Sequence, residues 1–150
     1  MRIFSNCSGF IFSVILAVAC PLFSQNITAE ALNIQEGDKA ILIKGSGVYH
    51  RTISTKEPLA QQFFDQGLRY AWGFYFPESI ASYQQAALHD PTHPMVYWGL
   101  AHAMGPNPNS RYSGMPDDPK SEGLKAIKKA LNLIDKAAPI EREMINALYV

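Results

Sequence analysis

Gln61-Gln-Phe-Phe-Asp-Gln-Gly-Leu68 and Tyr97-Trp-Gly-Leu-Ala101 are the two stretches that decide the fold. When the chain is aligned on itself with a displacement of 34 residues (97 − 63 = 34), three positions of the first stretch and its continuation meet similar residues. The pairs are Phe63 with Tyr97, Gly67 with Ala101, and Tyr70 with Met104. A fixed displacement of this size indicates stacked helical repeats.

Around these stretches, apolar residues recur three and four positions apart, which predicts amphipathic helices. Turn residues and prolines divide the pattern, because proline fits the first turn of a helix and not its interior. Five helices are expected; they run from about residue 57 to 72, from Pro77 to His89, from Pro94 to Met104, from Pro119 to Ala137, and onward from Pro139. A long loop dense in turn residues is expected between Gly105 and Asp118.

The residue types at the repeated positions resemble those of the tetratricopeptide repeat family. Besides Phe63, Gly67 and Tyr70, the first repeat has small, aromatic, small and proline residues where the family has them; these are Ser79, Tyr83, Ala86 and Pro91. Only Gln66 is a poor match, since Leu is usual there. The second repeat fits with Tyr97, Leu100 and Ala101, and then with Gly123, Ile127 and Ala130 if about ten residues are assigned to the loop.

The resemblance covers residues 57–150 and implies an all-α, TPR-like helical-hairpin solenoid of about two and a half repeats. Several phrases also resemble a group of longer exported bacterial repeat proteins of uncharacterised role, among them Ile53-Ser-Thr-Lys56 and Gly105-Pro-Asn107. The chain departs from that group where Tyr75-Phe76 replaces an Asn-His pair and where His93 replaces a Cys. Any site that depends on those residues is altered here.

The N-terminus predicts export. Residues 1–24 combine an early Arg2 with an apolar run too short to span a bilayer comfortably, which is typical of a signal peptide. Ala17-Val18-Ala19 permits ordinary cleavage and also resembles a lipoprotein signal ending at Cys20. We therefore expect a periplasmic or secreted protein, with a lipid anchor on Cys20 as the alternative. Residues 25–56 show no helical period and form an extended leader, in which Ala40-Ile-Leu-Ile43 is a candidate short strand.

Composition narrows the function classes. The 150 residues carry 13 Lys plus Arg against 13 Asp plus Glu, and no basic cluster stands apart from acidic neighbours, so nucleic acid is not an expected partner. Cys7 and Cys20 are the only cysteines and both lie in or beside the signal, so an intramolecular disulfide is not expected. Phosphate-loop, nucleophile-elbow and zinc-protease motifs are missing from the sequence, and Glu141 and Glu143 resemble ordinary surface charge; no enzyme activity is predicted.

A protein or peptide is the partner that the repeats suggest. In such solenoids the first helix of each hairpin lines a concave groove. By that geometry the expected groove residues are Phe64, Leu68, Trp72, Met95, Trp98 and His102, an aromatic and nearly uncharged set. The alternative for the first three is that they pack against the leader, which would then act as an intramolecular ligand. Asn107, Asn109 and Arg111 in the long loop could hold a ligand at the rim, or the loop could be a solvated insertion.

The runner-up function is a metal- or haem-binding envelope protein that uses His93, His102 and nearby methionines. Their spacing argues against it, because the two histidines fall at opposite ends of a predicted helix, and no metal or cofactor is expected. The fifth helix brings apolar residues to the last position, Val150, without a second helix to cover them. The sequence is therefore expected to be the N-terminal part of a longer protein.

Overall fold

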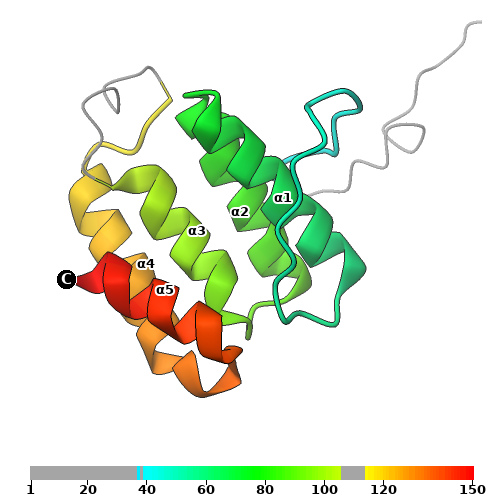
Figure 1. The fold of residues 1–150 in the computed structure, drawn as a ribbon. Coiled ribbons are helices and arrows are strands. Elements are labelled where there is room, and N and C mark those ends of the chain that lie inside the picture. The colour runs from blue at the N-terminus through cyan, green and yellow to red at the C-terminus, as the bar shows by residue number, and fades with distance from the viewer. Residues whose placement is uncertain (1–36, 38, 106–113) are drawn as a thin grey trace, which may run out of the picture.

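The computed structural model describes residue 37, residues 39–105 and residues 114–150, and within them the chain is helical with no strand (Figure 1). A 3₁₀ turn at Ile134–Lys136 separates the last two helices. The helices are α1 (Pro58–Trp72), α2 (Phe76–His89), α3 (Pro94–Met104), α4 (Pro119–Asn132) and α5 (Pro139–Tyr149). The expected fourth helix was too long, because the chain tightens into the 3₁₀ turn before Ala137.

Proline marks the beginning of every helix. Each of the five has Pro in its first or second position, where the missing N–H would have had no partner inside the helix. Two helices also have side-chain caps: His93 accepts from the Met95 N–H at α3, and Asp118 accepts from the Ser121 N–H at α4. These caps satisfy backbone donors that the helix itself leaves free.

Neighbouring helices pack on one another in chain order, and α3 also contacts both α1 and α5. Tyr83 of α2 lies at the centre, fully buried. A Cβ atom added to Gly67 of α1 would lie 2.8 Å from the Tyr83 ring, and one added to Gly99 of α3 would lie 2.3 Å from it. The two glycines therefore allow both α1 and α3 to approach the same edge of this ring closely.

In each of the two hairpins, α1–α2 and α3–α4, small residues lie where the two helices approach closely. In the first, the Ser79 hydroxyl of α2 donates to the Gly67 carbonyl of α1 at 2.7 Å. In the second, a Cβ on Gly123 of α4 would lie 3.6 Å from the Ala101 carbonyl oxygen of α3. The separations are 12 residues (79 − 67) and 22 residues (123 − 101), so the second pair lies ten residues further apart in the chain than the first. Small residues at both positions let the helices of each hairpin approach closely.

The expected strand at residues 40–43 is wrong. The leader has no strand partner in the described part of the chain and instead runs along α1, turns back at Gly45 and Gly47, and returns beside the same helix (Figure 1). Both glycines have positive φ, at 83° and 107°. The backbone groups of the leader find side chains of α1 and α2 as partners rather than another strand.

None of the helices in the described ranges is long and apolar enough to cross a bilayer. The predicted signal peptide with Cys20, and the loop candidates Asn107, Asn109 and Arg111, lie outside the described residues.

Candidate functional site

The six predicted groove residues fall into two groups. Those deep in the core are Phe64, Leu68, Met95 and Trp98, each at most 9% exposed. His102 is half-buried, and Trp72 is 67% exposed. Four of the six therefore present no surface to a partner in this state, and Trp72 is the member that remains open.

His102 connects the two groups. Its ring stacks on Trp98 with centroids 5.1 Å apart and lies 6.3 Å from the Trp72 ring. Burial lowers the pKa of His102, so the neutral ring is the favoured form. Its buried Nδ1 has no hydrogen-bond partner among the described residues. The three rings form a row that leads from the core to the surface.

Gln66 holds the outgoing part of the leader. Its side chain is buried, accepts from the Ile43 N–H at 2.8 Å and donates to the Ile41 carbonyl at 2.9 Å. It also donates to Ser82 of α2. The one poor match to the repeat pattern is thus explained, because an amide here satisfies both main-chain groups of an extended segment, as a neighbouring strand would.

Gln61 repeats this arrangement on the returning part of the leader. Its side chain accepts from the Ile53 N–H and donates to the Arg51 carbonyl, both at 2.9 Å. The adjacent Asp65, 5% exposed, accepts from the Arg51 N–H at 3.0 Å and pairs with His50 at 2.6 Å. Each glutamine binds residues two apart, which matches the period of an extended chain.

The returning leader also reaches α5. Ser54 donates to both oxygens of Glu141, through its N–H and its hydroxyl, each at 2.6 Å. The His93 Nε2 lies 3.0 Å from the Ser54 hydroxyl, while the His93 Nδ1 accepts from the Met95 N–H. With Nδ1 accepting, the proton of neutral His93 is on Nε2 and is donated to Ser54. A histidine that activates a serine nucleophile accepts the hydroxyl proton, whereas His93 donates to the Ser54 hydroxyl. Ser54, His93 and Glu141 therefore hold the leader in place in this arrangement.

The surroundings of this junction lower the pKa of both His93 and Asp90. Burial lowers the pKa of His93, and the opposing attraction of Glu141 and Asp90 does not overcome it. For Asp90, burial raises the pKa, but hydrogen bonds from Thr55 and Thr92 outweigh it and the pKa is lowered. Neutral His93 and ionised Asp90 are therefore the states that the folded chain prefers.

The expectation that Glu141 is ordinary surface charge is wrong, because its side chain is buried, with the residue 3% exposed. Its oxygens accept from Ser54 and from the Ala138 N–H at the beginning of α5, where the helix dipole also favours a carboxylate. The sequence did contain a signal that Gln61, Asp65 and Gln66 bind another segment, because these polar residues interrupt an otherwise apolar helix stripe. Glu141 gave no such signal.

The histidines of the runner-up function lie far apart. His93 caps the beginning of α3 and His102 belongs to its last turn. Nine residues of α-helix span about 13 Å, too far for both to bind one ion. No cluster of metal-ligating side chains occurs within the described ranges.

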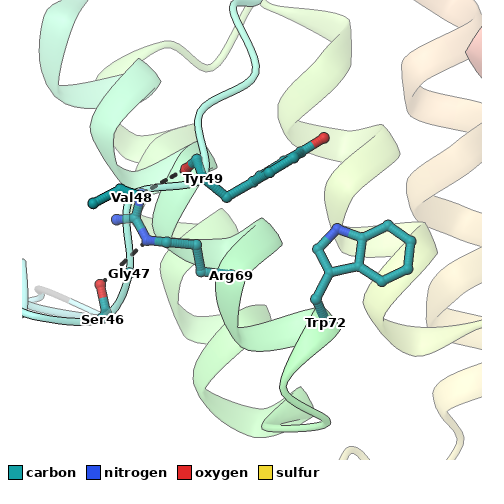
Figure 2. A pocket seen from close by; sticks show the side chains of 6 residues that line it. All are labelled: Ser46, Gly47, Val48, Tyr49, Arg69 and Trp72. Carbon is teal, nitrogen blue, oxygen red and sulfur yellow. Dashed lines mark hydrogen bonds between the residues drawn. The ribbon is translucent and has the colours of Figure 1, made fainter.

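A surface hollow of about 380 Å³ adjoins the row of rings, at the point where the leader turns back. Figure 2 shows the Tyr49 and Trp72 rings on one side of it and Arg69 beside the leader. Arg69 fixes the turn, donating from Nε to Ser46 at 3.2 Å and from Nη1 to the Tyr49 carbonyl at 2.9 Å. The hollow is therefore formed jointly by α1 and the leader.

No protein-family model, curated protein sequence or solved structure matches the chain.

Proposed function

We propose that the protein is an exported tetratricopeptide-type scaffold that binds an extended peptide segment of a partner protein. The repeat architecture is supported by small residues at corresponding positions of the two hairpins: Ser79 donates to the Gly67 carbonyl, and Gly123 lies close to the Ala101 carbonyl. Export rests on the character of residues 1–24.

The single observation that carries the binding function is the way α1 holds the leader. Gln66 and Gln61 each bind one N–H and one C=O of residues two apart, and Asp65 binds a further N–H between those clamps. Main-chain groups are common to all peptides, so these side chains are suited to any extended segment that supplies the right side chains at intervals. The leader is the intramolecular example of such a ligand.

The specificity of the returning segment comes from the side chains of the two clamped residues and of the neighbouring Ser54. Ile53 is 3% exposed and belongs to the core. Ser54 binds Glu141 and His93, and Arg51 approaches the Met144 sulfur at 2.7 Å. A peptide that replaces the leader should therefore carry an aliphatic residue followed by a hydroxyl residue.

A protease site inserted between Lys56 and Glu57 tests the proposal on the full chain. Both residues are exposed. After cleavage, the N-terminal piece should stay bound but exchange with an added synthetic peptide of residues 39–56, measured by fluorescence anisotropy of the labelled peptide. Methylation of the Ile53 nitrogen should weaken the peptide about tenfold, because Gln61 loses its donor.

The matched control is a peptide methylated at the Thr52 nitrogen, which makes no hydrogen bond in the described part of the chain; its affinity should change less. If the cut piece never exchanges, or if the cleaved chain unfolds, the leader is part of the core and the proposal fails.

A further inference from the structure

The leader covers only part of the α1 surface. Its returning segment follows α1 backward, from Arg69 at Tyr49 to Gln61 at Ile53. The last turn of α1 lies beyond this segment, and Trp72 there stays 67% exposed. A partner that leaves the leader in place can therefore reach the row of rings only at this end.

The surface at this end is apolar and unusually open. Val48 is 97% exposed and Tyr49 is 50% exposed, and both line the hollow with Trp72. Large apolar side chains gathered around a depression mark interaction sites more often than isolated exposed ones do. Aromatic rings contribute much of the binding energy at protein interfaces.

One backbone conformation beside the hollow is strained. Phe74, two residues after Trp72, has φ of 65°, and the residue is 55% exposed. Bulky residues rarely adopt this left-handed region, and the Phe74 ring packs edge-on against Phe76 while the residue stays half exposed. Gly47 in the hollow has φ of 107°, and a Cβ there would lie 3.1 Å from the Arg69 side chain.

The charge of the hollow is positive, because Arg69 is its one charged lining residue. Nε and Nη1 of Arg69 bind the leader, while Nη2 has no partner in the described ranges. The neighbouring Asp65 does not pair with it, since its oxygens accept from His50, Arg51 and Gln61. The Nη2 group of Arg69 can therefore donate a charge-assisted hydrogen bond to a carboxylate.

We propose that this hollow binds an acidic, extended peptide segment of a partner protein, with a large apolar side chain against Tyr49 and Trp72 and a carboxylate on Arg69. The inference rests on the proposed peptide-binding function and names its open site and ligand chemistry. Arg69 and Trp72 are three residues apart on α1, so their Cβ atoms are about 5 to 6 Å apart. Residues two apart in an extended chain point to the same side and are about 6.6 Å apart, so we expect one residue between the apolar and the acidic residue of the peptide.

The test uses the intact chain and the peptides acetyl-Phe-Ala-Glu-amide and acetyl-Glu-Ala-Phe-amide, because the direction of binding is open. The chain has two tryptophans, so its NMR spectrum reports two indole N–H signals. The Trp72 signal should shift saturably with at least one peptide. The Trp98 signal should not, because its N–H donates to the Met144 carbonyl in the interior.

The contribution of the peptide carboxylate is tested by changing the peptide, because a substitution of Arg69 would also remove its hydrogen bonds to the leader. Replacing Glu by Gln in the peptide should weaken binding about fivefold or more, and replacing Phe by Ala should abolish saturation. On the protein, Trp72→Ala should weaken binding about tenfold, followed through the Val48 amide signal. Tyr75→Ala is the matched control, since Tyr75 is 61% exposed and does not line the hollow.

Equal affinity for the Glu and Gln peptides, or binding that Trp72→Ala leaves unchanged, would overturn the inference. Peptide binding that shifts signals along Gln61 and Asp65 only would also overturn it, while leaving the proposed function standing. A Trp72 signal that responds to phosphatidylcholine vesicles and to none of the peptides would assign the hollow to a lipid surface instead. If the cleaved leader does not exchange with the added peptide, the proposed function fails, whereas binding of a peptide in the hollow is measured independently on the uncleaved chain.

Discussion

Substitution of Gly99 by Ala examines the contact on which the packing of α1, α2 and α3 depends. The new Cβ would lie 2.3 Å from Tyr83 Cε1, about 1.2 Å short of an ordinary carbon contact of about 3.5 Å. The same ring atoms already lie close to Gly67 of α1, where an added Cβ would be 2.8 Å from Cε1, so the ring has little free space beside that helix either. The clash must therefore be relieved by shifting a helix.

Overpacking of this kind costs about 1 to 3 kcal/mol, and Ala returns up to about 1 kcal/mol through its higher helix propensity. Because α1 and α3 both approach the ring closely, we expect a cost at the upper end and a net loss of about 1 to 2 kcal/mol. Urea unfolding followed by far-ultraviolet circular dichroism should show a lower midpoint with an unchanged slope.

The double variant Gly99→Ala with Tyr83→Leu supplies the control. A leucine removes the atoms that the new methyl group meets, so the double variant should be more stable than the sum of the single effects predicts, by about 1 kcal/mol or more. Additive effects, or a Gly99→Ala protein more stable than the parent, would refute the packing argument.

Three further outcomes are expected. Gln66→Leu introduces the residue that is usual in the repeat family. It should increase hydrogen exchange at the Ile43 amide about tenfold or more, but change global stability by about 1 kcal/mol or less, because water can bind the main-chain groups of Ile41 and Ile43 that lose their partner. Unchanged exchange at Ile43 would contradict the role of Gln66. Trp98→Ala should cost about 3 to 5 kcal/mol and Trp72→Ala about 0.5 kcal/mol or less in thermal unfolding, and similar losses would contradict their different burial. The folded chain holds the His93 pKa below its ordinary value of 6.5, so the unfolded chain binds protons more readily and stability should fall as the pH drops from about 6.5 through the lowered pKa. His93→Asn keeps a capping side chain and should reduce this dependence, with the remainder coming from His102, whose pKa is also lowered; an identical pH profile would exclude the role of His93.

Much of the fold could be predicted because its signals are local. Prolines at the beginnings of α1, α3, α4 and α5 and the turn at Asp90-Pro91 set boundaries that agree with the structure to within a few residues. The apolar spacing gave the helices themselves, since burying one face of a helix requires that period. The close contact at Gly67 was likewise predictable, but that at Gly99 was not, because the second repeat has Ala101 at the matching position and Gly99 lies outside the pattern.

The candidate site was harder to predict, because it depends on contacts between residues far apart in the chain. Ser54 and Glu141 are 87 positions apart, and no property of either residue indicates the other. The predicted groove residues lie on α1 and α3, but the sequence alone could not show that the core encloses Phe64 and Met95 while Trp72 stays exposed.

The sequence by itself determined the helices, their order and the small residues that let them approach, because backbone hydrogen bonding, proline geometry and apolar period act over a few residues. The tertiary structure alone decided the path of the leader. An extended segment has no hydrogen bonds of its own, so its position depends on which side chains can satisfy its main chain. In this protein Gln61, Asp65 and Gln66 satisfy it, and where that segment turns away from α1 the hollow beside Trp72 begins.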